Sequence, residues 1–534
     1  RELEKLSQRT LCSLYLVLQY FTNMSFRELL VLNLRPIWIF ALLLSLSGCG
    51  GGGGSSSSNS ATAYQPTSKE LAQICAKENP LAVNALNATR QGVLADEKKW
   101  VKAYMSERYL WYKDIPQVNE DDSRYNVLKN GALDVWNSLL NYFSDSKTPL
   151  KTAIGTLVDK FSFIIDSAEW NSFVDSSLRG YGFMLKTSTQ GGQKVLTVAY
   201  VYPNTPAKNA GVARGDQIIR IDGASVNDTS AEATSIFNEG LRPTKVAPHQ
   251  FQILRAGQTL NVTMQAEVIT LQQVEYKVLH VGSQKTGYLL FNSHVPGAEA
   301  YLIQAMTYFK QQAISDLVVD LRYNGGGYLA IANALAYSVA GREKAQGKVF
   351  EWTQFSDKRS SENYAMYFNS FGLNNQAYPS LGLAKIYVLA SSGTCSASES
   401  FINGLRGIDV QVELIGGTTC GKPYGFYPQD NCGITYGAME MEGVNAKFEG
   451  RFSDGMTPQC TVLDDLSRPL GDASEGMLSV AIKRMRGQSC SQAAGLAIGS
   501  QDLSGMALLD NSVLLRPEWQ NNKLLNTRPS ITSK

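Results

Sequence analysis

Apolar residues recur along the first third of the chain at steps of three and four positions. Two such series lie within residues 78–177, and they comprise Val101, Met105, Tyr109 and Tyr112, and then Leu133, Trp136, Leu140 and Phe143. Because an α-helix completes a turn in 3.6 residues, this spacing places the apolar side chains of each series on one face. The pattern predicts a helical domain over residues 78–177, with its aromatic side chains in the core.

The pattern then changes to short apolar runs separated by turn residues. These runs lie at 195–201, 251–254 and 260–264, and the last two flank the turn Arg255-Ala256-Gly257. Runs of this length that are bounded by turn residues predict short strands and hairpins. Residues 178–270 are therefore expected to form a small β-domain.

Predicted strands and helices alternate over residues 271–490. The strand-like runs lie at 287–291, 317–321, 385–390 and 412–415, and the helical segments lie at 298–311, from 328 onward and at 396–405. This alternation predicts an α/β layer architecture, in which functional groups lie at the C-terminal ends of strands. Residues 491–534 are interpreted as a C-terminal tail.

The N-terminal residues have the pattern of an exported protein. From Met24, two arginines precede a short apolar run at 37–44, and the small residues Leu46-Ser47-Gly48-Cys49 follow it. The run is well below the ~20 residues that a membrane span needs, so residues 24–48 are predicted to be a signal peptide.

The Leu-Ser-Gly-Cys ending resembles the bacterial lipobox, and this resemblance implies that Cys49 is lipid-modified and anchors the protein to a membrane. Glycines and serines follow it, so residues 49–77 are expected to be a flexible tether. Residues 1–23 precede the first methionine and are expected to be upstream translation. The predicted location is the bacterial cell envelope, facing the periplasm or the outside.

Composition and charge narrow the class of protein. The chain is 44% hydrophobic and 18% charged, as in a folded globular protein, and its formal net charge is +2. This small charge gives no argument for a nucleic-acid partner.

The cysteines are interpreted in the light of export. Six cysteines follow Cys49, the chain has three histidines, and no Cys-x-x-Cys pair is present. A zinc site is therefore not expected, and disulfides are, because an exported protein meets an oxidising compartment. Six cysteines allow 15 connectivities, and the bridge we favour is Cys420 to Cys432.

Three segments carry candidate chemistry. Residues 416–423 read Gly-Gly-Thr-Thr-Cys-Gly-Lys-Pro, which is most of a phosphate-binding P-loop, but Pro423 stands where Ser or Thr would bind Mg²⁺. Lys422 lies among apolar residues, and burial can lower the pKa of a lysine until it serves as a base. Ser396 begins a predicted helix, where it is either a helix cap or a nucleophile. The third segment ends in three glycines, Gly325–Gly327, whose N–H groups could face a ligand.

Residues 178–270 resemble a PDZ domain. The resemblance rests on the loop Tyr181-Gly182-Phe183-Met184, on a Pro-Ala-x-x-Ala-Gly helix start, and on the string Gly-Asp-Gln-Ile-Ile-x-Ile-Asp-Gly from residue 215. It implies that the Tyr181–Met184 loop holds an extended C-terminal peptide at a sheet edge.

Together with the three segments, this block resembles the C-terminal processing (tail-specific) serine peptidases, which have a ClpP/crotonase-like α/β core and an inserted PDZ domain. The strings that carry the resemblance are Asp-Leu-Arg-Tyr-Asn-Gly-Gly-Gly from residue 320, Ser-Ala-Ser-Glu from residue 396, and Gly421-Lys422. It implies that Ser396 is the nucleophile and Lys422 its base, and that the N–H groups of Ala397 and Gly326 form the oxyanion hole. No cofactor or metal is implied, and the expected partners are proteins or peptides with free C-termini.

Alternatives remain open at two points. Family members commonly carry a glutamine four residues after the lysine, and this chain has Phe426 there. His294, which follows a predicted strand, is the alternative base. The chain could also be a non-catalytic, membrane-tethered lipoprotein that uses its PDZ domain only to bind peptides. A crotonase-like acyl-CoA enzyme shares the core architecture, but it does not explain the lipobox or the PDZ-like block.

Overall fold

The computed structural model describes residues 64–490 apart from 176, together with 513–515 and 523–524. Its central element is a six-stranded sheet in the order β14-β15-β16-β20-β21-β26, which is parallel except for the β14–β15 hairpin. Its strands are β14 (Val274–Val281), β15 (Gln284–Phe291), β16 (Asp316–Asp320), β20 (Lys385–Ala390), β21 (Gln411–Gly416) and β26 (Cys460–Thr461).

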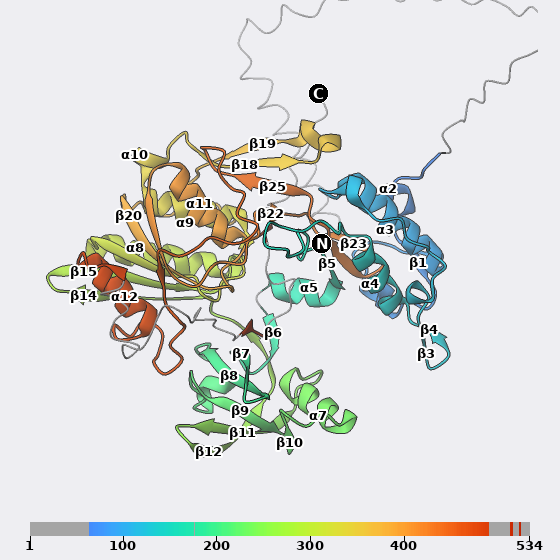
Figure 1. Ribbon diagram of the computed structural model, residues 1–534, viewed down its shortest axis with the longest axis horizontal. Helices are drawn as coiled ribbons and strands as arrows, with labels where there is room; N and C mark the ends of the chain where they lie inside the picture. Colours follow the sequence, from blue (N-terminus) through green and yellow to red (C-terminus); the bar gives the residue numbers. More distant parts are fainter. Residues whose placement is uncertain (1–63, 176, 491–512, 516–522, 525–534) are drawn as a thin grey trace, which may run out of the picture. The chain divides into compact units, whose positions relative to one another are not determined.

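Both faces of this sheet are buried. Successive side chains of a strand point to opposite sides, and each side packs against helices. Leu317 and Val319 of β16 face an apolar cluster that contains α8, α9 and α11. Val318, between them, faces a second cluster that contains α12. The helices, visible around the sheet in Figure 1, are α8 (Glu299–Gln312), α9 (Leu329–Ala340), the short α10 (Arg342–Ala345), α11 (Ala397–Gly407) and α12 (Gly476–Met485). The predicted α/β core is thus confirmed, with ends that differ by a few residues.

A second sheet carries the segment that follows Lys422. Its order is β19-β18-β25-β22, with bounds β18 (Val349–Phe355), β19 (Tyr364–Tyr367), β22 (Tyr424–Gly425) and β25 (Met441–Val444). Tyr424 pairs with Glu442 and Gly425 with Met441. The short strand β17 (Gly327–Tyr328), which follows the glycines, pairs with β28 (Lys523–Leu524).

The β-domain predicted over residues 178–270 is present. Its sheet has the order β12-β11-β9-β8-β7-β27, with β10 paired to β9. The strands are β7 (Phe183–Gln190), β8 (Gln193–Val201), β9 (Gln217–Ile221), β10 (Ala224–Ser225), β11 (Pro248–Arg255), β12 (Gln258–Gln265) and β27 (Val513–Leu514), and the helices are α6 (Pro206–Asn209) and α7 (Ala231–Leu241). The chain enters and leaves this domain through the antiparallel pair β6 (Ser177–Gly180) and β13 (Glu267–Thr270).

The N-terminal region is less purely helical than its apolar pattern predicts. Its helices are α2 (Ser68–Leu71), α3 (Leu94–Arg108), α4 (Val135–Asp145) and α5 (Ser167–Val174), and its strands are β1 (Ile74–Ala76), β2 (Arg90–Gly92), β3 (Leu128–Lys129), β4 (Ala132–Leu133) and β5 (Phe163–Asp166). β5 pairs with β24 (Ile434–Gly437), which in turn pairs with β23 (Gln429–Asn431). α2 and β1 also lie within the predicted tether of residues 49–77, so folded structure begins before its expected end.

The predicted Cys420–Cys432 disulfide is wrong. Cys432 bonds to Cys75, Cys420 bonds to Cys395, and the third bridge joins Cys460 to Cys490. The two cysteines of our prediction are near in sequence, but Cys432 turns toward the N-terminal region that packs on it, and Cys420 turns toward the start of α11. Three disulfides are typical of a protein outside the reducing cytoplasm.

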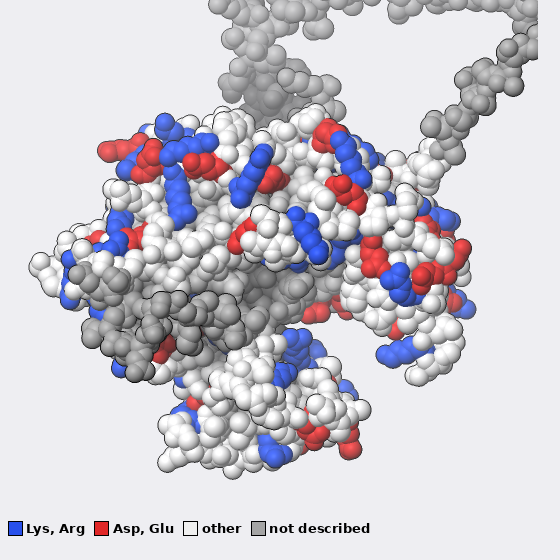
Figure 2. All heavy atoms as spheres, in the orientation of Figure 1, with Lys and Arg blue, Asp and Glu red and all other residues white. Residues whose placement is uncertain are grey.

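Charged side chains of both signs are interspersed on the face shown in Figure 2, in keeping with the small net charge. None of the helices in the described part of the chain has the length and apolar character needed to cross a membrane. The predicted signal peptide, the lipid-modified Cys49 and the glycine-rich start of the tether lie outside the described residues.

Candidate active site

Ser396 lies at the turn between β20 and α11, at the C-terminal end of a central strand. Its backbone has φ 61° and ψ −114°, a conformation that costs energy in a residue other than glycine. The side chain is fully buried, and within the described residues its Oγ has no hydrogen-bond partner. Ser396 therefore does not act as a side-chain cap of α11, and its hydroxyl is available for another role.

The turn before Ser396 is fixed to the end of β16. Thr394 Oγ1 donates to the Leu321 carbonyl over 2.8 Å, and the Cys395 N–H donates to the Asn324 carbonyl over 3.0 Å. Ser391 Oγ donates to the Arg322 carbonyl. These bonds join the serine turn to the strand that leads into the three glycines.

Glu399 connects the serine to the lysine. Its carboxylate is fully buried and accepts four hydrogen bonds, from Ser396 N at 2.8 Å, Lys422 N at 2.8 Å, Gly421 N at 2.9 Å and Thr419 Oγ1 at 2.5 Å. The N–H groups of Ser396 and Lys422 bind the same oxygen, Oε2, so the backbones of the two residues lie side by side. Burial raises the pKa of Glu399, against the effect of the donors.

The Cys395–Cys420 disulfide makes the same connection covalently. Cys395 immediately precedes Ser396, and Cys420 lies two residues before Lys422. The sulfurs and a Glu399 oxygen lie within 4.8 Å of one another. Because both sulfurs are in a disulfide, they are not thiolate ligands for a metal.

Lys422 is 1% exposed, and two aromatic rings lie close to its side-chain nitrogen. Its Nζ lies 5.3 Å from the ring centroid of Phe161 and 5.3 Å from that of Phe426. This distance is within the range of a cation–π contact. Phe426 stands at the position where the peptidases of the resemblance commonly carry a glutamine, and it contacts the lysine through its ring face.

The glycine segment lies beside the serine turn. Gly326 and Gly327 have φ 103° and 131°, and a Cβ on Gly327 would lie 2.3 Å from the His294 carbonyl oxygen. The Gly326 N–H donates to Asn324 Oδ1 over 2.9 Å, so this predicted oxyanion donor is bound within the loop. Ala397 is the first residue of α11, where N–H groups have no partner in the helix.

His294, the alternative base, is built into the glycine segment. Its N–H donates to the Gly326 carbonyl over 2.8 Å, and its carbonyl accepts from Tyr328 N over 2.7 Å. The ring is fully buried, with Nδ1 3.0 Å from Asn324 Oδ1. Burial lowers the pKa of His294 to about 4. These contacts fix His294 to the segment that carries Gly326, while its Nε2 has no hydrogen-bond partner among the described residues.

The four predicted peptide-binding residues lie where the chain enters β7. Tyr181 is buried, and its hydroxyl donates to the Gly240 carbonyl of α7 over 2.8 Å. Gly182 has φ 81°, and a Cβ there would lie 2.4 Å from Thr205. Phe183 and Met184 are the first residues of β7. The loop thus leads directly into the outermost strand of the domain's own sheet.

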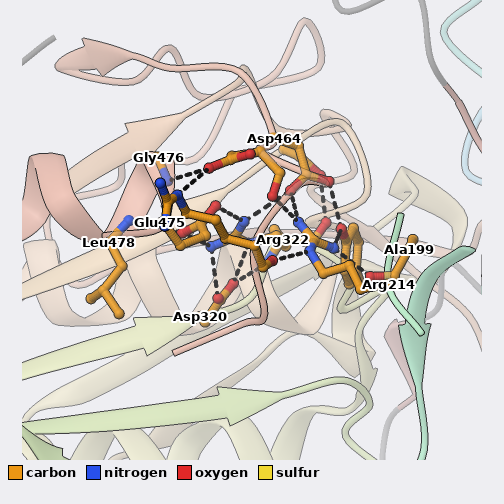
Figure 3. Close-up of polar contacts among 12 residues, drawn as sticks. Ala199, Arg214, Asp320, Arg322, Asp464, Glu475, Gly476 and Leu478 are labelled. Atoms are coloured by element: carbon orange, nitrogen blue, oxygen red, sulfur yellow. Dashed lines mark hydrogen bonds and ion pairs between the residues drawn. The ribbon is translucent and has the colours of Figure 1, made fainter. Parts of the chain in front are cut away.

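A buried charge network joins the β-domain to the core (Figure 3). Arg322, two residues beyond the end of β16, binds Asp320 and Glu475 through paired contacts of 2.7–3.1 Å, and it also reaches Asp464 over 2.9 Å. Arg214 of the β-domain binds Asp464 and the Tyr323 hydroxyl. Burial alone would raise the pKa of Asp464, but Arg214 and Arg322 hold it far below its ordinary value.

Several site residues were missed by the sequence analysis. From the sequence, Glu399 could be interpreted only as the partner of Ser396 in a helix-capping pair. Of the two bonds of such a pair, the one from Ser396 N to the Glu399 carboxylate is present. Thr419 and Phe161 gave no local signal, since each reaches the site through the fold. Arg322 stands in the Asp-Leu-Arg-Tyr-Asn-Gly-Gly-Gly string close to its partner Asp320, but its other charge partners, Asp464 and Glu475, lie more than 140 positions away.

Comparison with known proteins gives matches to two family models. A model of peptidase family S41 matches residues 285–426, and a model of the PDZ domain matches residues 172–247. The chain is 26% identical over 289 residues to the carboxyl-terminal-processing protease of Picosynechococcus sp., covering 52% of this chain and 65% of that protein. It is 24% identical over 274 residues to the carboxy-terminal processing protease CtpB of Bacillus subtilis, covering 50% of this chain and 52% of that protein.

The matched part thus spans between half and two thirds of the length of these relatives. A crystal structure described as an S41 protease of Bacteroides fragilis has the same fold, with a TM-score of 0.57, 24% identity, and coverage of 73% of this chain and 97% of that one. The S41 match lies in the α/β core and the PDZ match lies largely in the inserted β-domain, so both family matches agree with the observed fold. The chain accordingly has a core that matches peptidase family S41 and an inserted domain that matches the PDZ domain, and it is similar to C-terminal processing proteases.

Proposed function

We propose that this protein is a serine endopeptidase that cleaves other proteins near exposed C-terminal tails, with Ser396 as nucleophile and Lys422 as base. The observation that carries the proposal is the Glu399 carboxylate, which binds the N–H groups of both residues. The Cys395–Cys420 disulfide supports the same arrangement. If Ser396 were only a helix cap and Lys422 only a surface lysine, neither the Glu399 carboxylate nor the disulfide would be needed to join them.

The reaction is an acyl transfer. Ser396 Oγ forms a bond to the substrate carbonyl carbon while neutral Lys422 takes the hydroxyl proton. The C–N bond then breaks as Lys422 returns the proton to the leaving amine, and water hydrolyses the acyl-enzyme by the same steps. The Ala397 N–H donates to the oxyanion, and the Gly326 N–H joins it after leaving Asn324 Oδ1.

The PDZ domain supplies recognition of the substrate. The Tyr181–Met184 loop leads into β7, the outermost strand that residues 178–270 contribute to the sheet, and strand addition to such an edge gives affinity for extended peptides. The proposal also includes export and attachment to a membrane through Cys49. The three disulfides support export, because disulfides form in an oxidising compartment. The substrates are then proteins of the cell envelope.

The test uses residues 60–534, made without the lipid under oxidising conditions, with an unstructured protein that has an apolar C-terminus as substrate. We expect cleavage by the parent and none by Ser396→Ala. Ser400→Ala is the matched control, because Ser400 is also buried on α11 and its Oγ has no partner among the described residues. It should cleave like the parent.

The base is identified with two further variants. Lys422→Ala should lose cleavage, whereas loss in His294→Ala with a retained fold, and not in Lys422→Ala, would reverse the assignment. If neither the parent nor Ser396→Ala cleaves but both bind the tail peptide, the protein is a peptide-binding module and the peptidase proposal is wrong.

A further inference from the structure

The outermost strand of the PDZ domain is already occupied by another part of the chain. β27 pairs antiparallel with β7, with Val513 opposite Thr187 and Leu514 opposite Lys186. The Leu515 N–H continues the pairing by donating to the Leu185 carbonyl over 2.7 Å. Strand addition is the way in which PDZ domains take peptides, so this C-terminal segment lies where a ligand strand would lie.

Side chains of the segment also fit their surroundings. Leu515 packs against the apolar cluster of the PDZ domain and lines a pocket with Ser235 and Leu241 of α7. Leu514 packs instead against the cluster on the α12 side of the core sheet. Because neighbouring side chains of a strand point to opposite sides, Leu515 anchors the segment in the PDZ groove while Leu514 contacts the core.

A second strand of the same segment lies at the active site. β28 pairs in parallel with β17, with Lys523 opposite Gly327 and Leu524 opposite Tyr328. Gly327 follows the predicted oxyanion residue Gly326. β28 also contacts β22, which begins two residues after Lys422. The strand therefore contacts the segments that follow the predicted oxyanion donor and the predicted base, so it lies beside two groups that a substrate backbone has to reach.

We propose that the C-terminal segment is an internal competitor, which holds β27 in the PDZ groove and β28 along the active site of the same molecule. This inference rests on the proposed function, because it assigns both strands to positions of a substrate. A protein tail that is to be cleaved must displace both.

The covalent connection makes such a competitor effective. A ligand on a short tether has an effective concentration on the order of 1 mM. A segment with an intrinsic Kd of about 100 μM would then raise the apparent KM for substrate about tenfold. It would leave kcat unchanged, since displaced strands contact no reacting group.

The test compares residues 60–534 with residues 60–500, a chain that lacks both strands and keeps Cys490 for its bond to Cys460. We expect KM to fall about tenfold with kcat unchanged, and a synthetic peptide of residues 508–526 to inhibit the shorter chain competitively. Leu515→Asp in the longer chain should also lower KM. Val246→Asp, at an exposed apolar position of the PDZ domain, is the control and should not.

Three results would overturn the inference. The first is an equal KM for the longer and the shorter chain. The second is rapid removal of the segment near residue 523 by the parent but not by Ser396→Ala, which would make the segment a substrate. The third is a difference in KM that grows with protein concentration, which would place the segment of one copy in the groove of another.

A binding measurement separates this inference from the peptidase proposal. Ser396→Ala is made in both chains, and each is titrated with a fluorescent peptide that has an apolar C-terminus. Tighter binding by the shorter chain supports the internal competitor even if no variant cleaves anything. Equal binding contradicts it even if the parent is an active peptidase.

Discussion

At the scale of single residues, the site depends on a buried carboxylate that never needs to touch a substrate. Glu399 binds backbone N–H groups on both sides of the site and the Thr419 hydroxyl. A buried carboxylate without such donors would cost several kcal/mol, and here every donor also fixes a piece of the site. The Ser-Ala-Ser-Glu string therefore contains the proposed nucleophile as its first residue, and its last residue holds that nucleophile in position.

Lys422→Arg separates the charge of the lysine from its chemistry. An arginine keeps a cation near the rings of Phe161 and Phe426, but it does not deprotonate in proteins. We expect a chain with the parent's circular dichroism spectrum and melting temperature close to the parent's, and a kcat lowered by roughly 10²-fold or more.

The control for this prediction is Lys98→Arg on α3. Lys98 is also buried, and its Nζ donates to the Glu120 carbonyl over 2.7 Å. The Lys98→Arg chain should cleave substrate at the parent rate. A Lys422→Arg chain that cleaves as fast as the parent would exclude the lysine as the base.

At the scale of elements, two disulfides of similar loop length allow a matched comparison. Cys395–Cys420 spans 25 positions at the active site, and Cys460–Cys490 spans 30 positions between β26 and the end of α12. We expect the double alanine variant of either pair to lose about 3 kcal/mol of unfolding free energy, measured by denaturant titration.

Only the Cys395→Ala/Cys420→Ala variant should also lose kcat, because that bridge joins the segments of Ser396 and Lys422. The measurement is kcat at saturating substrate, below the denaturation midpoint of both variants. An equal effect of the two variants on kcat would mean that the first bridge only stabilises the fold.

α3 carries a group whose titration should be visible in the stability of the protein. Burial raises the pKa of Glu97 to about 7, while its carboxylate accepts from Ala76 N over 2.7 Å. Since the folded pKa exceeds the ordinary value of 4.5, stability from this group is present below pH 4.5 and is lost as the pH rises through about 7.

Relative to Glu97→Gln, the parent should therefore lose about 3 kcal/mol of unfolding free energy between pH 4.5 and pH 7.5. Denaturant titrations of both chains across this range provide the measurement. A constant difference between the two chains would show that Glu97 titrates alike in the folded and unfolded states.

The sequence predicted elements well where their residues make local patterns. β16, β20, β21, α8 and α11 lie within a few residues of the expected positions, because each shows a continuous apolar run or a helical period. β5 was missed, because its partner β24 lies about 270 positions away. The disulfide pairing failed for the same reason, since Cys75 and Cys432 meet only when the N-terminal region packs on the core.

The candidate site follows the same division. Ser396, Lys422, Gly326 and Ala397 came from short strings, through the resemblance to a family. The groups that contact these residues were found only in the structure. Phe426 is an example: the sequence showed only that an unusual residue follows Lys422, and the structure showed that its ring lies over Lys422 Nζ. A string specifies which chemistry is available, whereas the partners of a buried group depend on distant segments.

At the scale of the whole molecule, Arg214 is one of the residues that couple the PDZ domain to the core, together with Lys186, whose Nζ lies 3.3 Å from Asp464 Oδ2. The Arg214 side chain is 7% exposed and binds Asp464 and Tyr323. Removal of one member of a buried charge network costs about 3–5 kcal/mol. We expect Arg214→Ala to show a separate unfolding transition of the PDZ domain at lower temperature in calorimetry.

Arg255→Ala is the control, because Arg255 pairs with Asp216 inside the PDZ domain over 2.6 Å. It should lower the stability of that domain without separating it from the core. A single transition in Arg214→Ala, at the melting temperature of the parent, would show that other contacts couple the two parts.

The Cys75–Cys432 bridge has a consequence for the order in which the protein is made. It closes a covalent loop of 357 positions. In addition, β5 of the N-terminal region has its pairing partner, β24, in the C-terminal half of the chain. Domains usually fold in the order of their synthesis, N-terminal first. Here the first region to emerge from the ribosome cannot be completed until residue 437 has followed it. We therefore expect the N-terminal helices to stay unprotected longest, and an export machinery that delivers the chain from its N-terminus has to pass residue 437 across before the first-made part can close.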